Sequence, residues 1–243
     1  MSRFYAPPEN IRGNAIYIDG QEARHILNVM RLGLNDKVVV FDGTGKEYIG
    51  FINDVKPKSL KIEIVSTKTP RAEDAPRITL VQAIPKKEKM DYIVEKSTEL
   101  GVHRIIPVIS ERTVVRPEKD KRANKVIRWR KIARESAKQC GRVDVPEVKD
   151  VQKFFNVIDE VNSYDLALLA CLSGDTIGIK QAISNFAAGN ILVFIGPEGD
   201  FTPEEIIMAG NTSCKFISLG KRVLKSDTAG IFVLSVLNYE LAR

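Results

Sequence analysis

The chain has 243 residues, of which 44% are hydrophobic and 28% are charged, and its formal net charge is +6. This composition is typical of a globular protein and excludes a disordered chain, and no apolar run approaches the ~20 residues that span a bilayer. The first ten residues lack the apolar core of a secretion signal, and the chain has only two histidines and three dispersed cysteines. We therefore expect a reduced, cytoplasmic protein with no membrane segment and no metal site.

The first 70 residues are dominated by short segments that predict β-strands. Four segments are apolar or rich in β-branched and aromatic residues, at 15–18, 37–42, 46–52 and 59–65. The glycines of the 42–45 segment predict a hairpin turn, because glycine adopts positive φ at little cost. Apolar residues at helical spacing predict one helix over 21–30. The sequence thus predicts a small, barrel-like β domain over residues 1–70.

The polar segment 69–76 carries two prolines and predicts a linker at 71–76, and strands alternate with helices from residue 77 to 243. This alternation predicts a parallel sheet covered by helices on both faces. Strands are expected at 77–84, 104–109, 165–172, 190–196 and 215–220. Helices are expected at 87–100, 124–139 and 177–186, from 203 onward, and at 228–241.

Positive charge is concentrated between Arg112 and Arg142, where twelve lysines and arginines face three acidic residues. Such a run indicates attraction to the phosphate backbone of RNA or DNA, without base specificity. A solvated helix face is the alternative interpretation. Trp129 lies between Arg128 and Arg130, and core packing is favoured there over base stacking. Cys140 is expected to be packed rather than reactive.

Three strand ends carry glycine-rich or polar segments, at 169–174, 195–205 and 219–229. Ligands of parallel α/β sheets bind beyond the carboxyl ends of the strands, where exposed backbone amides orient them. Thr202, Pro203 and Glu205 also match a plain helix start with a capping box, so both interpretations stay open. Neither GxGxxG nor GxxxxGK[ST] is present, which argues against an ordinary dinucleotide or P-loop site.

The segments GPEGDFTPEE, LGKRVLKSDTAG and ARESAKQCGR resemble the RsmE family of 16S ribosomal RNA methyltransferases, a branch of the SPOUT superfamily. Similarity extends to HILNVMRLGLNDKVVVFDGTGKEY and KKEKMDYIVEKSTELGVHRIIPVISERTVV. The resemblance implies an N-terminal PUA-like small β-barrel and a C-terminal SPOUT domain with a trefoil knot. It also implies a homodimer that methylates N3 of a uridine in 16S ribosomal RNA, or in the small subunit, from S-adenosylmethionine.

The resemblance also implies which residues bind the cofactor. The residues expected to line S-adenosylmethionine are Leu169, Leu172, Gly196, Gly199, Leu219, Gly220, Val223 and Leu224. The chain departs from the family at three positions. Asp200 stands where a glycine is usual, Lys225 where an arginine is usual, and Asp227 where a glutamate is usual. An acid at Asp200 is expected to restrict φ or to place a charge near the ligand.

Methylation of N3 requires loss of its proton, so we expect an acidic residue and a cation beside the base. Glu198 or Asp227 is expected to assist deprotonation, and Arg222 to stabilise the negative charge on uracil. The alternatives are an anion at a helix entrance for Glu198, an N-cap for Asp227 and a phosphate contact for Arg222. RNA contacts are expected at Arg112, Arg134 and Arg142, with Arg31 and Lys86 as additions.

Two other functions are compatible with the sequence. Asp200 would spoil the cofactor pocket in a non-catalytic RNA-binding factor that assists ribosome assembly. A methyltransferase for tRNA or for another ribosomal RNA base is the second alternative, because fold does not fix substrate.

Overall fold

The computed structural model describes residues 3–69, 76–116 and 118–241. The chain forms two compact units, one of Met1–Ala72 with Ala137–Val145 and one of Glu73–Ser136 with Pro146–Arg243. Of the linker expected at 71–76, only Pro76 is among the described residues. Within the described ranges, no helix is long and apolar enough to cross a membrane.

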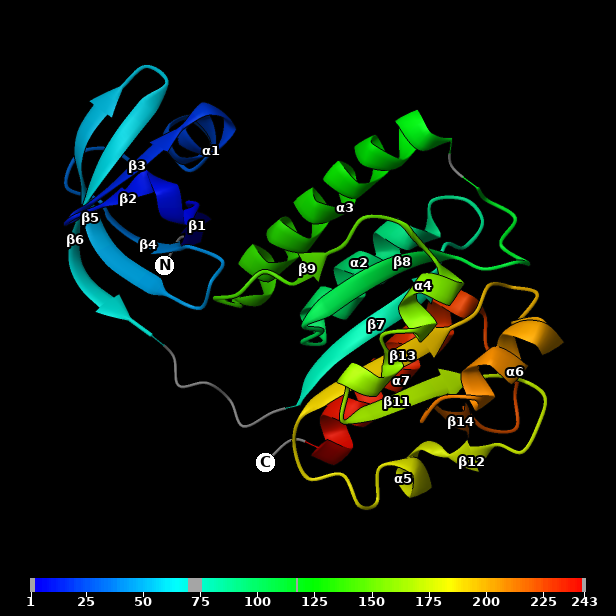
Figure 1. The fold of residues 1–243 in the computed structure, drawn as a ribbon. Helices are drawn as coiled ribbons and strands as arrows, with labels where there is room; N and C mark the ends of the chain where they lie inside the picture. The colour runs from blue at the N-terminus through cyan, green and yellow to red at the C-terminus, as the bar shows by residue number, and fades with distance from the viewer. Residues whose placement is uncertain (1–2, 70–75, 117, 242–243) are drawn as a thin grey trace. The chain divides into compact units, whose positions relative to one another are not determined.

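The first unit is built on a six-stranded mixed sheet (Figure 1). Its strands follow the order β1-β4-β5-β6-β3-β2, in which β1 and β4 are parallel and the other pairs antiparallel. The strands are β1 (Arg3–Tyr5), β2 (Ile11–Arg12), β3 (Ala15–Asp19), β4 (Lys37–Phe41), β5 (Glu47–Lys56) and β6 (Ser59–Lys68). The four predicted strands are confirmed, whereas β1 and β2 were not predicted.

The predicted helix of this unit is present as α1 (Gly20–Arg24), which continues as the π-helical η2 (His25–Val29). Alternate residues of β3 to β6 point into one core, which Ile26 from η2 joins. The expected turn after β4 is held by Asp42, whose Oδ1 accepts the Thr44 and Lys46 backbone N–H groups at 2.8 and 3.2 Å. The spacing of apolar residues thus correctly predicted the four principal strands and the helix of this unit.

The second unit contains an eight-stranded parallel sheet, with β9 beside β8 and the remaining strands in the order β10-β8-β7-β13-β11-β14-β12. Its strands are β7 (Arg77–Ala83), β8 (Arg104–Ile109), β9 (Glu147–Val148), β10 (Gln152–Lys153), β11 (Leu166–Ala170), β12 (Ile177–Gly178), β13 (Asn190–Ile195) and β14 (Lys215–Ser218). The five predicted strands are confirmed, and β9 and β10 are short additions. The helix expected at 177–186 is mostly wrong, because β12 occupies its first two residues and only 179–182 is helical.

Helices cover both faces of this sheet (Figure 1). They are α2 (Lys89–Glu99), α3 (Lys119–Cys140), α4 (Phe154–Ile158), α5 (Ile179–Ala182), α6 (Pro203–Gly210) and α7 (Ser226–Leu241). Helix α7 packs against α2, α5, β7 and β13, and α4 packs against α6. Residues of β7 divide between the two faces: Val81 joins the core around α4 and α6, whereas Leu80 lies beside Gly230 of α7.

Glycine ends two of the long helices as predicted. Gly101 follows α2 with φ of 78° and Gly141 follows α3 with φ of 85°. Their amides bond to carbonyls of the preceding turn, those of Thr98 and Ala137. These are the left-handed C-terminal positions that glycine occupies without strain.

Gly50 of β5 is expected to be intolerant of any side chain. A Cβ at Gly50 would lie 2.3 Å from the backbone oxygen of Glu63 in β6, and backbone cannot move aside as a side chain can. Gly50→Ala should therefore lower the free energy of unfolding by about 1–3 kcal/mol. Gly33→Ala is the matched control, since a Cβ there meets nothing within 4 Å. Thermal denaturation of both variants checks this, and equal melting temperatures would contradict it.

Candidate functional site

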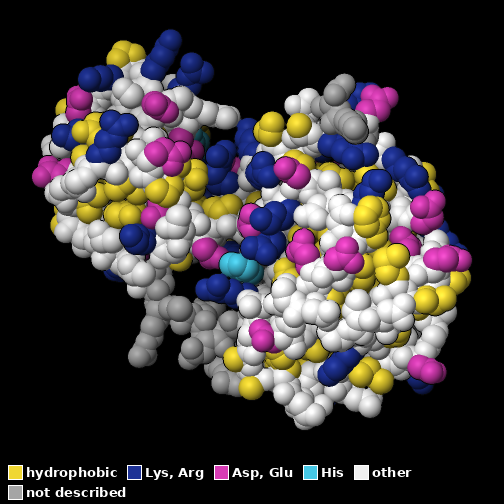
Figure 2. All heavy atoms as spheres, viewed as in Figure 1, with side chains coloured by type: hydrophobic (Ala, Val, Ile, Leu, Met, Phe, Trp, Pro, Cys, Tyr) yellow, Lys and Arg dark blue, Asp and Glu magenta, His cyan; other side chains and the backbone are white. Residues whose placement is uncertain are grey.

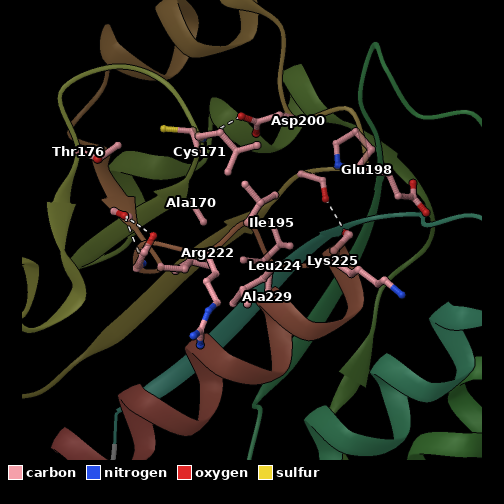
Figure 3. Close-up of a pocket in the computed structure, with 18 of the residues that line it drawn as sticks. Ala170, Cys171, Thr176, Ile195, Glu198, Asp200, Arg222, Leu224, Lys225 and Ala229 are labelled. Carbon is pink, nitrogen blue, oxygen red and sulfur yellow. Dashed lines mark hydrogen bonds between the residues drawn. The ribbon is translucent and has the colours of Figure 1, made fainter.

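A pocket of about 410 Å³ lies where β11, β13 and β14 end (Figure 3). The parallel register places these ends level, because Ala170 pairs with both Ile195 of β13 and Ile217 of β14. The walls come from the three following loops and from the start of α7. Its lining includes Ala170, Cys171, Leu172, Thr176, Ile195, Gly196, Pro197, Glu198, Asp200, Ser218, Leu219, Gly220, Lys221, Arg222, Val223, Leu224, Lys225, Ser226 and Ala229.

A buried chain of hydrogen bonds joins three elements beneath the pocket. The side-chain amide of Gln82 in β7 donates to the Ser226 hydroxyl at 2.9 Å, and that hydroxyl donates to the Gly196 carbonyl at 2.6 Å. Gln82 is fully buried and Ser226 is 5% exposed. Buried polar groups are costly unless paired, so this chain fixes the start of α7 against the loop after β13. We name it the Gln82–Ser226–Gly196 chain.

Asp200 links the loop after β13 to the loop after β11. Its Oδ2 accepts the Leu172 backbone N–H at 2.9 Å, and its φ is +60°. Aspartate is among the few non-glycine residues that occupy this left-handed region readily. Asp200 therefore occupies a backbone conformation that glycine favours, and it forms a hydrogen bond across the pocket wall.

The turn into α6 is fixed by its own capping box and by the loop that follows β8. Thr202 and Glu205 exchange side-chain to backbone hydrogen bonds, which confirms the predicted helix start. The second oxygen of Glu205 accepts the Glu111 backbone N–H at 2.9 Å. Arg112, predicted to contact RNA, donates from Nη1 to the carbonyls of Gly199 and Phe201 at 2.9 and 3.2 Å. Arg112 thus positions this turn.

Six of the eight predicted cofactor residues line the pocket, while Leu169 and Gly199 do not. Side chains alternate along a strand, so Leu169 points into the core around α4 and α6 and is fully buried. Its neighbour Ala170 faces the pocket instead. Gly199 lies against the Arg112 side chain.

The three predicted catalytic residues occupy different places. Glu198 lines the pocket, and its Oε1 accepts the Lys86 backbone N–H at 2.9 Å. Arg222 also lines the pocket and is exposed. Asp227 does not line it: its Oδ1 pairs with Lys89 Nζ at 2.9 Å. Helix α7 begins at Ser226, so Asp227 is in the first turn and is not the N-cap.

The other residues predicted to contact RNA are dispersed. In the first unit, Arg31 is exposed with φ of +54°, and Arg142 is half-buried and paired with Asp144 at 2.6 Å. In the second unit, Lys86 is exposed, and Arg134 lies 3.9 Å from Glu135. The structure does not gather these residues into one cluster within either unit.

Lysine and arginine side chains gather around the start of α3 (Figure 2). A second hollow, of about 290 Å³, lies there and is lined by Lys87, Lys121, Lys125 and Arg128 among others. Trp129 forms its floor, 2% exposed, with Nε1 donating to Asp91 at 3.1 Å, so Trp129 is a core residue as favoured. Among the described side chains, no group of three or more His, Cys, Asp or Glu is arranged to hold a metal ion.

Two protein families match most of the chain. The RNA methyltransferase domain family matches residues 72–238, and the RNA methyltransferase PUA domain family matches residues 18–65. Ribosomal RNA small subunit methyltransferase E of Bacillus subtilis is 29% identical over 228 residues, which are 92% of this chain and 89% of that protein.

Solved structures agree with the whole fold. A methyltransferase of Legionella pneumophila in complex with the bound cofactor SAM is 32% identical, with a TM-score of 0.88 over 98% of this chain and 97% of that chain. Ribosomal RNA small subunit methyltransferase E of Neisseria gonorrhoeae, bound to S-adenosyl methionine, is 29% identical, with a TM-score of 0.85 over 99% of this chain and 98% of that chain.

The three cysteines are expected to react at very different rates. Burial raises the pKa of the Cys171 thiol to about 11, with a smaller contribution from Asp200, and burial raises the pKa of Cys214 to about 12. Cys140, contrary to the prediction that it packs, is exposed. Since the thiolate is the nucleophile, iodoacetamide at pH 7.5 should label Cys140 first.

Mass spectrometry of the labelled peptides measures this order. Labelling of Cys171 should accelerate about tenfold per pH unit as pH rises toward its raised pKa, because the thiolate fraction grows by that factor. Equal labelling of Cys140 and Cys171 at pH 7.5 would contradict the burial of the pocket thiol.

Proposed function

The chain belongs to the RsmE family of RNA methyltransferases, and on that premise we propose that it transfers a methyl group from S-adenosylmethionine to 16S ribosomal RNA. The observation that carries the proposal is the pocket at the ends of β11, β13 and β14, which six of the residues expected to bind the cofactor line. Ligands of parallel sheets bind at this edge.

The residues of the pocket fit this cofactor. A volume of about 410 Å³ is within the range of small-molecule sites, which are mostly apolar with a few polar groups. Ile195, Leu172 and Leu224 supply apolar walls for an adenosine, and Gly220, with φ of 111°, leaves its backbone open to a ligand. When bound, S-adenosylmethionine supplies an electrophilic methyl group on a sulfonium centre.

The finer proposal is that the methyl acceptor is N3 of a uridine, as the family resemblance implies. N3 carries a proton, so the base must lose it before or during transfer. Glu198 lines the pocket, and its Oε1 accepts a hydrogen bond from the Lys86 backbone N–H. We assign to the Glu198 carboxylate the role of accepting this proton. Arg222 supplies a positive charge for the anion that develops on the uracil oxygens. Asp227 is assigned to positioning, since it pairs with Lys89 outside the pocket.

Binding of RNA is supported by cations of the second unit. Lys87 and Lys125 line the second hollow and carry the positive charge that phosphates require, whereas Arg128 and Lys121 there pair with acidic side chains. Arg134 belongs to the same helix α3. Lys86 and Arg112 hold the turn that bears Glu198, so RNA contact by these two, and by Arg31 and Arg142 of the first unit, stays a prediction.

A homodimer and a cytoplasmic location complete the proposal. Leu172 and Val223 line the pocket yet are 65% and 75% exposed. Apolar side chains this exposed at a site are typical of a surface that a second subunit covers. A substrate in the small ribosomal subunit places the enzyme in the cytoplasm. The knot implied by the resemblance stays a prediction.

The non-catalytic alternative rested on damage to the pocket by Asp200. The pocket is formed with Asp200 in its wall, at a backbone conformation that aspartate tolerates. Asp200 also ties two loops together through the Leu172 amide. This observation favours the enzyme over the assembly factor.

Methylation of small ribosomal subunits from cells that lack this enzyme tests the proposal. Tritiated S-adenosylmethionine should label 16S ribosomal RNA, and mass spectrometry of nucleosides should find 3-methyluridine. Glu198→Gln should lower kcat by about 10²–10⁴-fold with cofactor affinity retained, because only proton transfer is lost. Glu204→Gln, on the exposed first turn of α6, is the matched control and should keep full activity.

Each contrary outcome has a distinct meaning. Absence of any labelled RNA would overturn the proposed activity. A different methylated base would retain the methyltransferase and overturn uridine N3. Unchanged kcat in Glu198→Gln would overturn the role assigned to that carboxylate.

A further inference from the structure

The pocket wall carries a negative charge that the described residues do not neutralise. Asp200 lines the pocket, and its carboxylate accepts the Leu172 backbone N–H at 2.9 Å. In the parts of the chain that the structure describes, Asp200 forms no ion pair. Its charge is felt by its neighbours, since Asp200 adds to the effect of burial in raising the pKa of the Cys171 thiol.

The cations of the pocket are placed differently from Asp200. Figure 3 shows Asp200 beside the loop of Cys171, while the charged ends of Arg222 and Lys225 point away from that loop. Lys221, the third cation of the lining, is exposed like Arg222 and Lys225, so water screens all three more than it screens the half-buried Asp200. The wall formed by the loops after β11 and β13 is therefore the negative side of the pocket.

Charge is the main difference between the cofactor of methyl transfer and its product. The carbon–sulfur bond to the methyl group breaks, its electron pair stays on sulfur, the methyl carbon bonds to the acceptor nitrogen, and that nitrogen loses its proton. The sulfonium of S-adenosylmethionine thereby becomes the neutral thioether of S-adenosylhomocysteine. Apart from one methyl group, a wall residue can distinguish the two ligands only through that charge.

Asp200 lies at short range from the interior of the pocket. Its side chain lines the pocket, and its Oδ2 is 2.9 Å from the backbone nitrogen of Leu172, which is another lining residue. Charges closer than the Debye length of about 8 Å at physiological salt are only partly screened, so Asp200 acts on a charge bound beside this wall. The effect grows further where the bound ligand displaces water, because the local dielectric falls.

We propose that Asp200 gives the pocket a preference for S-adenosylmethionine over S-adenosylhomocysteine, and so promotes replacement of the spent product by fresh cofactor. The inference rests on the proposed function, and it deepens it by assigning cofactor selectivity to one residue. Asp200 acts through charge at the ligand, in addition to its hydrogen bond to the Leu172 amide.

Two substitutions separate the charge from the hydrogen bond. Asp200→Asn removes the charge, while an asparagine oxygen still accepts the Leu172 N–H and asparagine tolerates the positive φ. Asp200→Gly keeps the backbone conformation and loses both the charge and the hydrogen bond. Asp159→Asn makes the same charge change at an exposed residue just after α4, outside the pocket lining, and is the matched control.

Calorimetric titration of the full chain with each ligand measures the ratio of the two dissociation constants, Kd of S-adenosylhomocysteine over Kd of S-adenosylmethionine. Asp200→Asn should lower this ratio about fivefold, and Asp159→Asn should leave it unchanged within twofold. Asp200→Gly should lower the ratio equally and weaken both ligands further, because the two loops are no longer joined. Circular dichroism confirms that each variant is folded.

The contrary results are distinguishable. If Asp200→Asn keeps the wild-type ratio, whether or not both affinities shift together, Asp200 only joins the loops and the inference is overturned. Should Asp200→Asn fail to fold, an unchanged ratio in Asp200→Gly overturns it in the same way. If the wild-type chain binds neither ligand, the proposed function itself fails, and the inference fails with it.

Discussion

The architecture of the pocket depends on one buried chain of hydrogen bonds, which runs from Gln82 through Ser226 to the Gly196 carbonyl. It connects the middle of the sheet to the first residue of α7 and to the loop after β13. Space for it exists because Gly230 has no side chain: a Cβ there would lie 2.8 Å from the Gln82 carbonyl oxygen. Loss of a buried hydrogen bond of this kind costs about 1–3 kcal/mol, so the bond from the Gln82 side-chain nitrogen to the Ser226 hydroxyl holds the start of α7 in one position.

Two further contacts fix the loops after β11 and β13, beyond the Gln82–Ser226–Gly196 chain of hydrogen bonds. Asp200 joins the loops after β11 and β13, and Arg112 holds the carbonyls on either side of Asp200. The loops around the pocket are thereby ordered before any ligand arrives. A site ordered in advance loses less conformational freedom on binding, which favours affinity for a small cofactor. The same contacts fix the loop that bears Glu198, at the pocket that a ribosomal RNA base must approach.

The sequence predicted the elements whose pattern is long or strongly periodic. The four principal strands of the first unit, five strands of the second and the helices after them follow from apolar spacing, which reports burial directly. The segment from residue 143 to 164 gave no prediction, and its elements β9, β10 and α4 are only two to five residues long. Elements so short are fixed by their neighbours in space.

The site was predicted less completely than the fold, for reasons that particular residues show. Leu169 lies in the core and Ala170 lines the pocket, and a continuous apolar strand does not reveal in advance which of its residues face the pocket. The roles of Gln82 and Ser226 were missed because these two hydrogen-bond partners are 144 residues apart in the sequence. Only the family resemblance pointed to S-adenosylmethionine, since no spacing rule encodes its pocket.

Calorimetric titration of Ser226→Ala with S-adenosylmethionine tests the central claim most directly. Removal of the hydroxyl interrupts the Gln82–Ser226–Gly196 chain of hydrogen bonds beneath the pocket. The affinity for S-adenosylmethionine should therefore fall about tenfold, which corresponds to about 1.4 kcal/mol. Ser235→Ala is the matched control, because its hydroxyl bonds only within α7, to the Ile231 carbonyl at 2.9 Å. It should bind as the wild type does. Wild-type affinity in a folded Ser226→Ala variant would show that the pocket does not depend on this chain.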